Sequence, residues 1–401
     1  RSLVDILSKV KYKINPTVIV HDNIEVEQIF IEQNIHFYKL HFHLDYVKIG
    51  NSNEEKRLEN VIESYKVARQ LLPIIEKENI HLIHINSSVS SFGAIAALMA
   101  NIPYIWHVRE LMEEQFNCEF LNKTLKHYLY KKSDSIITIS DYVKDEYHKK
   151  YRIDTKRIYN GLDIKKYKMN IDKDKKYNST FLVAAMITPE KRQWDVIQAT
   201  QMLVKDGYVN IKVIIVGKGE DRYVWALKKY ITRNKLEKNI FILPFQSDLS
   251  ELRKQSSYAI TSSQNEALGR VTIEAMLAGN LVIGARSGGT IEIIGESEER
   301  GILYELGNVD ALAKVMLKVM NYSNSDKYAI INRAQSYAEI TFDSIAYCDN
   351  LIKLYDKVIE SFIPKKAENF LNEIKIYCEV SKEITNNVRN DDVFLLLKKS
   401  N

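Results

Sequence analysis

The feature that most constrains the fold of this chain is the alternation of short β-branched runs with longer amphipathic stretches along most of its length. Residues 181–186 and 211–216, for example, form apolar runs of strand length, and a stretch with helical periodicity lies between them. Consecutive strands that are joined through a helix run parallel, because the helix returns the chain to the same edge of the sheet. The sequence therefore predicts an α/β protein built from βαβ units.

The alternation occurs in two blocks. In the first block, we expect strands at 17–21, 36–40, 82–85, 104–108 and 135–139, and helices at 53–78 and 92–100. In the second block, we expect strands at 181–186, 211–216, 240–243, 258–261, 281–284 and 302–304, and helices at 193–206, 224–234 and 270–278. Each block thus has enough strands for its own Rossmann-like sheet.

The stretch between the blocks, 163–178, is polar and rich in lysine, which is typical of a linker. We therefore predict one Rossmann-like domain at 1–162 and a second at 163–343, with a ligand cleft at the carboxyl ends of the strands. A last helix at 344–362 is expected to cross back to the first domain, and 363–401 forms a charged tail with no assigned role. The chain opens at Arg1 within a helical pattern, so we expect a strand and loop to be missing ahead of it.

Composition excludes several classes of protein. The longest apolar runs of the 401 residues are far shorter than the roughly 20 residues that span a bilayer. Three widely spaced cysteines argue against a disulfide framework or a cysteine metal site and favour a reducing compartment such as the cytoplasm. The net charge of +5 is compatible with an anionic substrate and is too small to indicate nucleic-acid binding.

The most informative stretch is 261–295, TSSQNEALGRVTIEAMLAGNLVIGARSGGTIEIIG. A strand is predicted to end near Ser262, and a helix to begin near Arg270 after a polar loop. The first N–H groups of such a helix lack partners, so they suit a phosphate, and Gly269 lets the backbone approach an anion closely. Glu266 and Glu274 flank this helix start, and their carboxylates can accept hydrogen bonds from sugar hydroxyls.

This stretch resembles the signature of glycosyltransferase family 4, in which seven residues separate two glutamates. The resemblance implies that Glu266 contacts the donor sugar, that Glu274 binds the ribose hydroxyls, and that the backbone of Leu268, Gly269 and Arg270 binds the pyrophosphate. An alternative is that Glu274 only pairs with Arg270 at helical i,i+4 spacing and that Glu266 only caps the helix.

Further stretches match the same family in the same order. TPEKRQ at 188–193 resembles its phosphate-binding loop and supplies Lys191, and IIVGKGED at 214–221 resembles the next loop and supplies Gly217. IPYIWHVRE at 102–110 resembles the strand end that places His107 and Arg109 at the cleft. The resemblance implies a catalytic site of His107, Glu266 and Lys191, with Arg109 and Gly217 among the donor-binding residues.

One position departs from the family pattern. Many members carry an arginine five residues before the lysine, where this chain has Met186. A thioether cannot replace a guanidinium as a bidentate phosphate ligand. Arg192 and Arg270 are the candidates that could compensate.

The resemblance implies a retaining glycosyltransferase of the GT-B fold, with two facing Rossmann-like domains. It would move a hexose-type sugar from a UDP- or GDP-linked donor to a glycan or lipid-linked acceptor, in bacterial surface polysaccharide or glycolipid synthesis. No metal is expected, since the D-x-D string at 172–174 lies in the lysine-rich linker. The alternatives are a non-catalytic GT-B subunit that stabilises a partner and a sugar-nucleotide epimerase; a dehydrogenase lacks support because no complete G-x-G-x-x-G follows a strand.

A membrane contact is a further hypothesis. Leu121, Leu125, Tyr128 and Leu129 share one face of a predicted helix, and Lys123, Lys126, Lys131 and Lys132 spread over its other faces. Such a helix could rest on an anionic membrane, which would make the protein peripheral at the inner face of the plasma membrane. The alternative is an ordinary amphipathic helix that packs on its own sheet.

Overall fold

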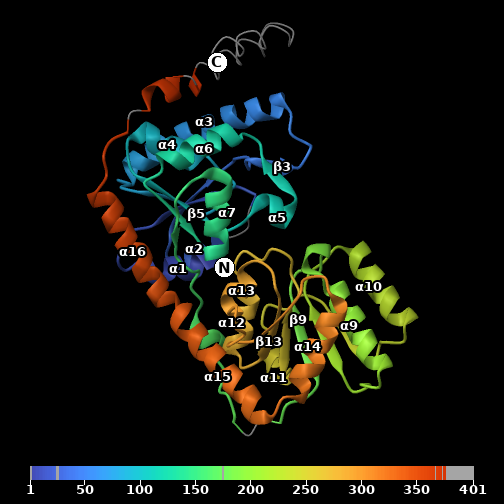
Figure 1. The fold of residues 1–401 in the computed structure, drawn as a ribbon. Helices are drawn as coiled ribbons and strands as arrows, with labels where there is room; N and C mark the ends of the chain where they lie inside the picture. Colours follow the sequence, from blue (N-terminus) through green and yellow to red (C-terminus); the bar gives the residue numbers. More distant parts are fainter. Residues whose placement is uncertain (1, 24–26, 174–175, 366, 373, 376–401) are drawn as a thin grey trace. The chain divides into compact units, whose positions relative to one another are not determined.

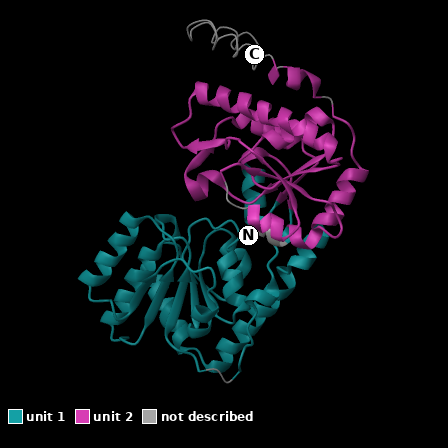
Figure 2. Ribbon diagram, turned by 180° about the vertical axis from the view of Figure 1, so that it is seen from behind, with its two compact units in different colours: residues 1–6, 138–149, 157–350 teal, residues 7–137, 150–156, 351–401 magenta. Residues whose placement is uncertain are grey.

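A computed structural model describes residues 2–23, 27–173, 176–365, 367–372 and 374–375 of the chain (Figure 1). The chain divides into two compact units (Figure 2). Unit 1 comprises residues 1–6, 138–149 and 157–350, and unit 2 comprises 7–137, 150–156 and 351–401. None of the helices in the described ranges combines the length and the apolar character that crossing a bilayer requires.

Unit 1 contains a parallel sheet of six strands in the order β11-β10-β9-β12-β13-β14. The strands are β9 Thr180–Ala184, β10 Lys212–Val216, β11 Ile240–Leu243, β12 Tyr258–Thr261, β13 Leu281–Ala285 and β14 Ile302–Tyr304. Counted within this unit, the order is 3-2-1-4-5-6, which is that of the classic doubly wound sheet. The order reverses between β9 and β12, so the loops that leave these two strands form the expected ligand site.

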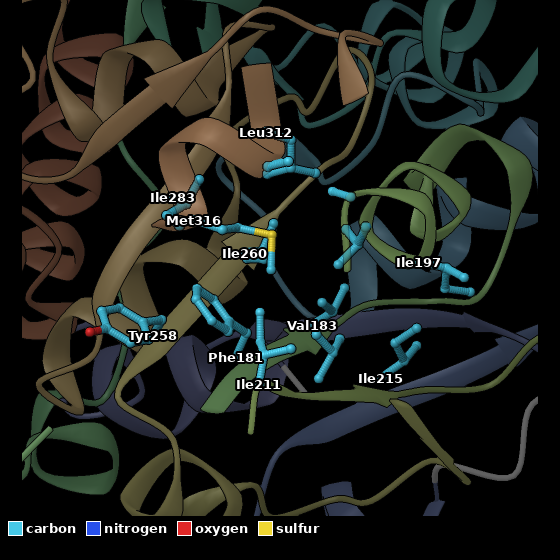
Figure 3. Packing of buried hydrophobic residues seen from close by; sticks show 14 of the residues in the cluster. Phe181, Val183, Ile197, Ile211, Ile215, Tyr258, Ile260, Ile283, Leu312 and Met316 are labelled. Atoms are coloured by element: carbon cyan, nitrogen blue, oxygen red, sulfur yellow. The ribbon is translucent and has the colours of Figure 1, made fainter. Parts of the chain in front are cut away.

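Helices cover both faces of this sheet (Figure 1). The helices of unit 1 are α8 Ile164–Tyr167, η1 Pro189–Lys191, α9 Gln193–Lys205, α10 Asp221–Arg233, α11 Ser250–Gln255, α12 Arg270–Leu277, α13 Gly289–Ile294, α14 Val309–Asn321 and α15 Asn324–Thr341. Buried residues of α9, α10 and α14 join the sheet in one apolar cluster, in which Leu312 and Met316 of α14 lie over Phe181 and Ile260 (Figure 3). This packing fixes the strands whose ends carry the candidate site.

The described residues of unit 2 form three small sheets. Parallel β1 Thr17–His21 and β2 His36–Leu40 form one, antiparallel β3 Tyr46–Lys48 and β6 Cys118–Phe120 another, and β4 Ile83–Ile85, β5 Tyr104–Val108, β7 Ser135–Thr138 and β8 Lys156–Arg157 the third. The helices are α2 Glu27–Glu32, α3 Glu54–Lys77, α4 Phe92–Ala100, α5 Met112–Phe116 and α6 Lys123–Lys132. Helices α1 Ser2–Val10, α7 Asp141–Tyr151 and α16 Ser344–Glu360 each have residues in both units, and strands β7 and β8 each end on a residue of unit 1.

The predicted α/β class and the parallel sheets are confirmed. The lysine-rich stretch is not a plain linker, because it contains α8, which packs against α12. Asp172 is exposed, and Asp174 lies outside the described residues. The domain boundaries expected from the sequence, including the role of 344–362, stay a prediction.

The prediction of a basic surface on α6 is wrong at the central lysine of this helix. Lys126 is buried, with its ammonium 2.6 Å from Oδ2 of Asp45 and 2.8 Å from the carbonyl oxygen of Ser88. Asp45 also accepts hydrogen bonds from Ser91 at 2.6 Å and from Asn60 at 3.1 Å. A buried ammonium needs such partners, and this one is therefore unavailable to a membrane.

The apolar face of α6 is occupied as well. Leu125 and Leu129 are buried, and the ring of Tyr128 stacks on that of Phe370 at 4.2 Å. Lys123 pairs with Glu113 at 3.2 Å and with Glu119 at 3.4 Å. The alternative interpretation, an amphipathic helix packed on its own unit, is the one that the structure supports, and α6 gives no support for a membrane contact.

Candidate active site

The loops that leave β9 and β12 meet at the point where the strand order of unit 1 reverses. Strand β12 pairs with β9 only at Tyr258 and Ala259, and the two loops continue beyond that pairing. They are joined by a backbone hydrogen bond, 2.9 Å long, from the N–H of Gln264 to the carbonyl oxygen of Glu190. Ser262 adds a bond from its hydroxyl to the oxygen of Lys191 at 2.7 Å.

This junction brings two predicted catalytic residues together. Lys191 ends the 3-10 turn η1, and its ammonium lies 2.6 Å from Oε2 of Glu266 in the loop after β12. The two side chains are 24% and 17% exposed, so both groups can still be reached by a ligand. A charged donor and a carboxylate thus meet where the two loops come together, and Cγ of Glu266 lies 3.5 Å from the position that a Cβ at Gly269 would take.

The loop of Glu266 is held by two glycines at the start of α13. Gly289 donates its N–H to the backbone carbonyl oxygen of Glu266 at 2.7 Å, and the hydroxyl of Ser287 accepts from the backbone N–H of Asn265 at 2.8 Å. Gly288 has φ +55°, and a Cβ at this position would lie 2.4 Å from the backbone carbonyl oxygen of Glu266. Only glycine permits this close approach, so the SGG turn fixes the loop that carries the carboxylate.

Helix α12 begins as the sequence predicts, with Gly269 in the left-handed region at φ +90°. The N–H of Thr272 donates to the carbonyl oxygen of Gly269 at 3.0 Å, and the N–H groups before it stand at the position where a helix supplies no carbonyl partner of its own. The carboxylate of Glu266 bonds to Lys191, and no side chain caps α12 at Gly269. Leu268, Gly269 and Arg270 therefore present backbone at a helix start that favours an anion.

The carboxylate of Glu274 pairs with two arginines, of which the sequence predicts only one. Its Oε1 is 3.1 Å from Nε of Arg270, which is the i,i+4 pair named above as the alternative interpretation. Its Oε2 accepts from Arg253 of α11, whose side chain is only 4% exposed. Arg253 is separated from Glu274 by 21 positions, and no pattern in the sequence links the two. The two arginines hold the carboxylate in a fixed orientation.

The structure also shows the surroundings of Met186, the position at which this chain differs from the family pattern. Its side chain is 62% exposed, beside the loop that carries Lys191. Of the two arginines considered as substitutes, Arg192 binds Asp195 through two nitrogens at 2.7 and 3.2 Å, and Arg270 binds Glu274. Each guanidinium is thus already engaged by a carboxylate.

Gly217 has a packing reason of its own. A Cβ at this position would lie 1.8 Å from the oxygen of Ala185, where the loop after β10 crosses the loop after β9. No side chain fits this crossing. The glycine therefore serves to bring the backbone of the two loops together.

Glu292 of α13 is a largely buried carboxylate that the sequence does not single out, and it links α13 to the start of α7. Its carboxylate accepts from the backbone N–H groups of Asp141 at 2.9 Å and Tyr142 at 3.3 Å, and from the hydroxyl of Tyr159. Burial raises the pKa of Glu292, while these hydrogen bonds oppose the rise. The hydroxyl of Ser140 donates to the oxygen of Ala267, so the start of α7 contacts both α13 and the Glu266 loop.

Two of the predicted site residues, His107 and Arg109, belong to unit 2. All the predicted site residues described above belong to unit 1. His107 is fully buried on β5, with Nδ1 3.2 Å from Nε2 of His84. The other nitrogen of His84 lies 2.6 Å from the hydroxyl of Tyr355 in α16. Burial, aided by the charge of Arg109, lowers the pKa of His84 to about 3 and that of His107 well below its usual value. Both rings are therefore neutral near pH 7, and their proton positions are linked through the chain of hydrogen bonds.

Two family models match the chain. "Glycosyl transferases group 1" matches residues 163–336, and "Glycosyltransferase Family 4" matches 41–166. The two matches meet where the lysine-rich stretch begins, and together they include every predicted site residue.

Individual proteins agree with these matches at low identity. An uncharacterised glycosyltransferase of Methanocaldococcus jannaschii is 28% identical over 65% of this chain and 70% of its own. The UDP-Gal:α-D-GlcNAc-diphosphoundecaprenol α-1,3-galactosyltransferase of Escherichia coli is 23% identical over 76% of this chain and 80% of its own. The crystal structure of Anabaena HepE in complex with UDP superposes with a TM-score of 0.70 at 21% identity, covering 89% of this chain and 95% of that one.

Proposed function

This chain belongs to the group 1 glycosyltransferases of family 4, which are retaining enzymes of the GT-B fold, and from that premise we propose that it transfers a hexose from a UDP-sugar to a lipid-linked glycan acceptor. That it takes a sugar from a nucleotide sugar follows from the family. The proposal concerns the nucleotide, the sugar, the acceptor and the residues that carry the reaction.

One observation carries the assignment of the site: the contact between Lys191 and Glu266 beside the start of α12, at the switch point of the sheet. The helix start binds the diphosphate through backbone N–H groups. Lys191 stabilises the charge that develops on the departing diphosphate, and Glu266 accepts from hydroxyls of the donor sugar. A catalytic role for His107, which belongs to unit 2, rests on the family resemblance alone.

The choice of donor and acceptor rests on relatives. HepE of Anabaena was crystallised with UDP, which favours a uridine nucleotide here over a guanosine nucleotide. The Escherichia coli relative acts on a GlcNAc-diphosphoundecaprenol, which supports a lipid-linked acceptor of the kind used in bacterial surface polysaccharide synthesis.

The donor site is tested by replacing its two glutamates separately. Glu274→Gln should weaken UDP binding by about 1–3 kcal/mol, because the ribose loses a hydrogen bond to a charged acceptor. Glu266→Gln is the matched variant. It should bind bare UDP as the wild type does and lose transfer, since Glu266 faces the sugar.

Calorimetric titration with UDP measures both affinities, and thermal unfolding of each variant shows whether the loss of the Arg253 contact has disturbed the fold. Unchanged UDP affinity in a folded Glu274→Gln variant would overturn the ribose assignment.

The same titration tests the second candidate, a non-catalytic GT-B subunit, which is favoured by the exposed Met186 and by the engagement of Arg192 with Asp195. Such a subunit should bind no UDP.

A further prediction concerns chelation. We expect transfer to survive EDTA, because Lys191 and the start of α12 supply the positive charge that a divalent cation provides in other transferases. The measurement is release of UDP from the donor with EDTA, and with magnesium or manganese added back. Complete loss of transfer that either of these cations restores would contradict the prediction.

A further inference from the structure

Two parallel strands of unit 2 end beside each other in a histidine-rich sequence. Strands β1 and β2 pair in register, with His21 opposite Leu40, so the residues that follow them lie at one edge of the sheet. A backbone bond from Asp22 N to the oxygen of Leu40, 3.1 Å long, continues the pairing. This places His21, Asp22 and His41 together although 20 positions separate the two histidines.

The side chains of these three residues converge. Oδ1 of Asp22 lies 2.9 Å from Nδ1 of His21 and 3.2 Å from Nδ1 of His41, and one ligand atom from each residue lies within 4.8 Å of the others. Across the described ranges, no other group of His, Cys, Asp or Glu side chains converges in this way. Asp22 and His41 are 40% and 59% exposed, so an ion from solvent can reach the cluster.

Neighbouring rings restrain the two imidazoles. The ring of Phe42 packs edge-on against His21 at 4.8 Å, and His21 and His41 meet at 5.2 Å. His43 lies 5.3 Å from His41, which makes it the nearest further imidazole. The N–H of Asn23 donates to Nδ1 of His21 at 3.1 Å, so a cation bound at that nitrogen would replace this hydrogen bond.

We propose that His21, Asp22 and His41 form a binding site for a divalent cation of the zinc type. Two ligands that each lie about 2.0–2.1 Å from one zinc ion are about 2.9–3.4 Å apart at octahedral to tetrahedral angles, which includes the separations from Asp22. Imidazole nitrogen and carboxylate oxygen suit zinc, nickel and cobalt better than magnesium or calcium. The three residues leave coordination positions open for water, for His43 or for an anionic ligand. The site does not rest on the proposed function, since the donor residues belong to unit 1.

The test is calorimetric titration of the full chain with zinc chloride, after EDTA treatment and desalting. We expect one saturable site in the wild type, and at least about tenfold weaker binding in Asp22→Asn and in His41→Ala, since even the loss of an outer partner costs 10–100-fold. His36→Ala is the matched control, because His36 is an exposed histidine on the same strand as Leu40 that lies 3.5 Å from a single carboxylate, Glu78. It should bind zinc as the wild type does.

Cysteines are the main competing ligands. Cys118 and Cys348 are buried, and a Cys378→Ser background removes the third from consideration. Cobalt gives a second readout, because an absorption band of the bound ion should be lost in the same two variants. The absence of saturable zinc binding in the wild type would overturn the proposal, as would equal affinity in the wild type, Asp22→Asn and His41→Ala. The cluster would then be a carboxylate that lies between two imidazoles and holds no cation.

Discussion

Replacing Lys126 by glutamate should destabilise unit 2 by at least about 3–5 kcal/mol, the cost of leaving one member of a buried ion pair without its partner. The glutamate would stand against Asp45 with both side chains almost fully buried, since those of Lys126 and Asp45 are 1% and 2% exposed. Burial lowers the pKa of Lys126 and Asp45 opposes that effect, so the ammonium depends on this carboxylate. A typical domain is stable by only about 5–15 kcal/mol, so much of the unit should unfold.

Lys131→Glu is the control on the same helix. Lys131 is exposed at the end of α6, and a surface charge change of this kind usually alters stability by no more than about 0.5 kcal/mol. Urea unfolding followed by circular dichroism and by tryptophan fluorescence measures both variants, and Trp106 lies 4.9 Å from the Lys126 ammonium. Equal stability of Lys126→Glu and Lys131→Glu would show that the Lys126–Asp45 pair does not hold the unit together.

The fold could be predicted to a large extent, because the signal that sets it is local. Strands β1, β2, β5, β11, β12 and β14 have the bounds expected from the sequence. Strands β3 and β6 were missed, since they have three residues each and pair across 70 to 74 positions, and the two-residue strand β8 was missed as well. The burial of Lys126 could not be foreseen either, because Asp45 lies 81 positions away and lysine is otherwise a surface residue.

The same distinction holds in the site. Glu266, Gly269 and Glu274 stand in one continuous stretch, so their placement at a helix start could be predicted from the sequence. Arg253, Glu292 and Tyr355 act through partners that only the tertiary structure brings near. The cluster of His21, Asp22 and His41 is an intermediate case. Its signal was present, since the histidines end or follow two predicted neighbouring strands, but recognising it required knowing that those strands pair.

Lys191→Met should lower the rate of sugar transfer by about 10²–10³-fold, the usual cost of removing one preorganised group that stabilises transition-state charge. The ammonium is held 2.6 Å from Glu266 by a turn whose backbone oxygens accept bonds from Gln264 and Ser262. Methionine keeps the length of the side chain and removes its charge. The loss should therefore appear mainly in kcat, because the charge it balances develops only as the diphosphate departs.

Lys212→Met is the matched control for this prediction. Lys212 is an exposed lysine at the amino end of β10, the opposite edge of the same sheet from the site, and its replacement should leave kcat unchanged. Rates of UDP release with saturating donor and acceptor distinguish the two variants, and calorimetry with UDP shows whether Lys191→Met still binds the nucleotide. If kcat stays within a few-fold of the wild type in Lys191→Met, the departing diphosphate does not depend on this lysine. The backbone at the start of α12 would then be the main source of positive charge, and Lys191 would serve to orient Glu266.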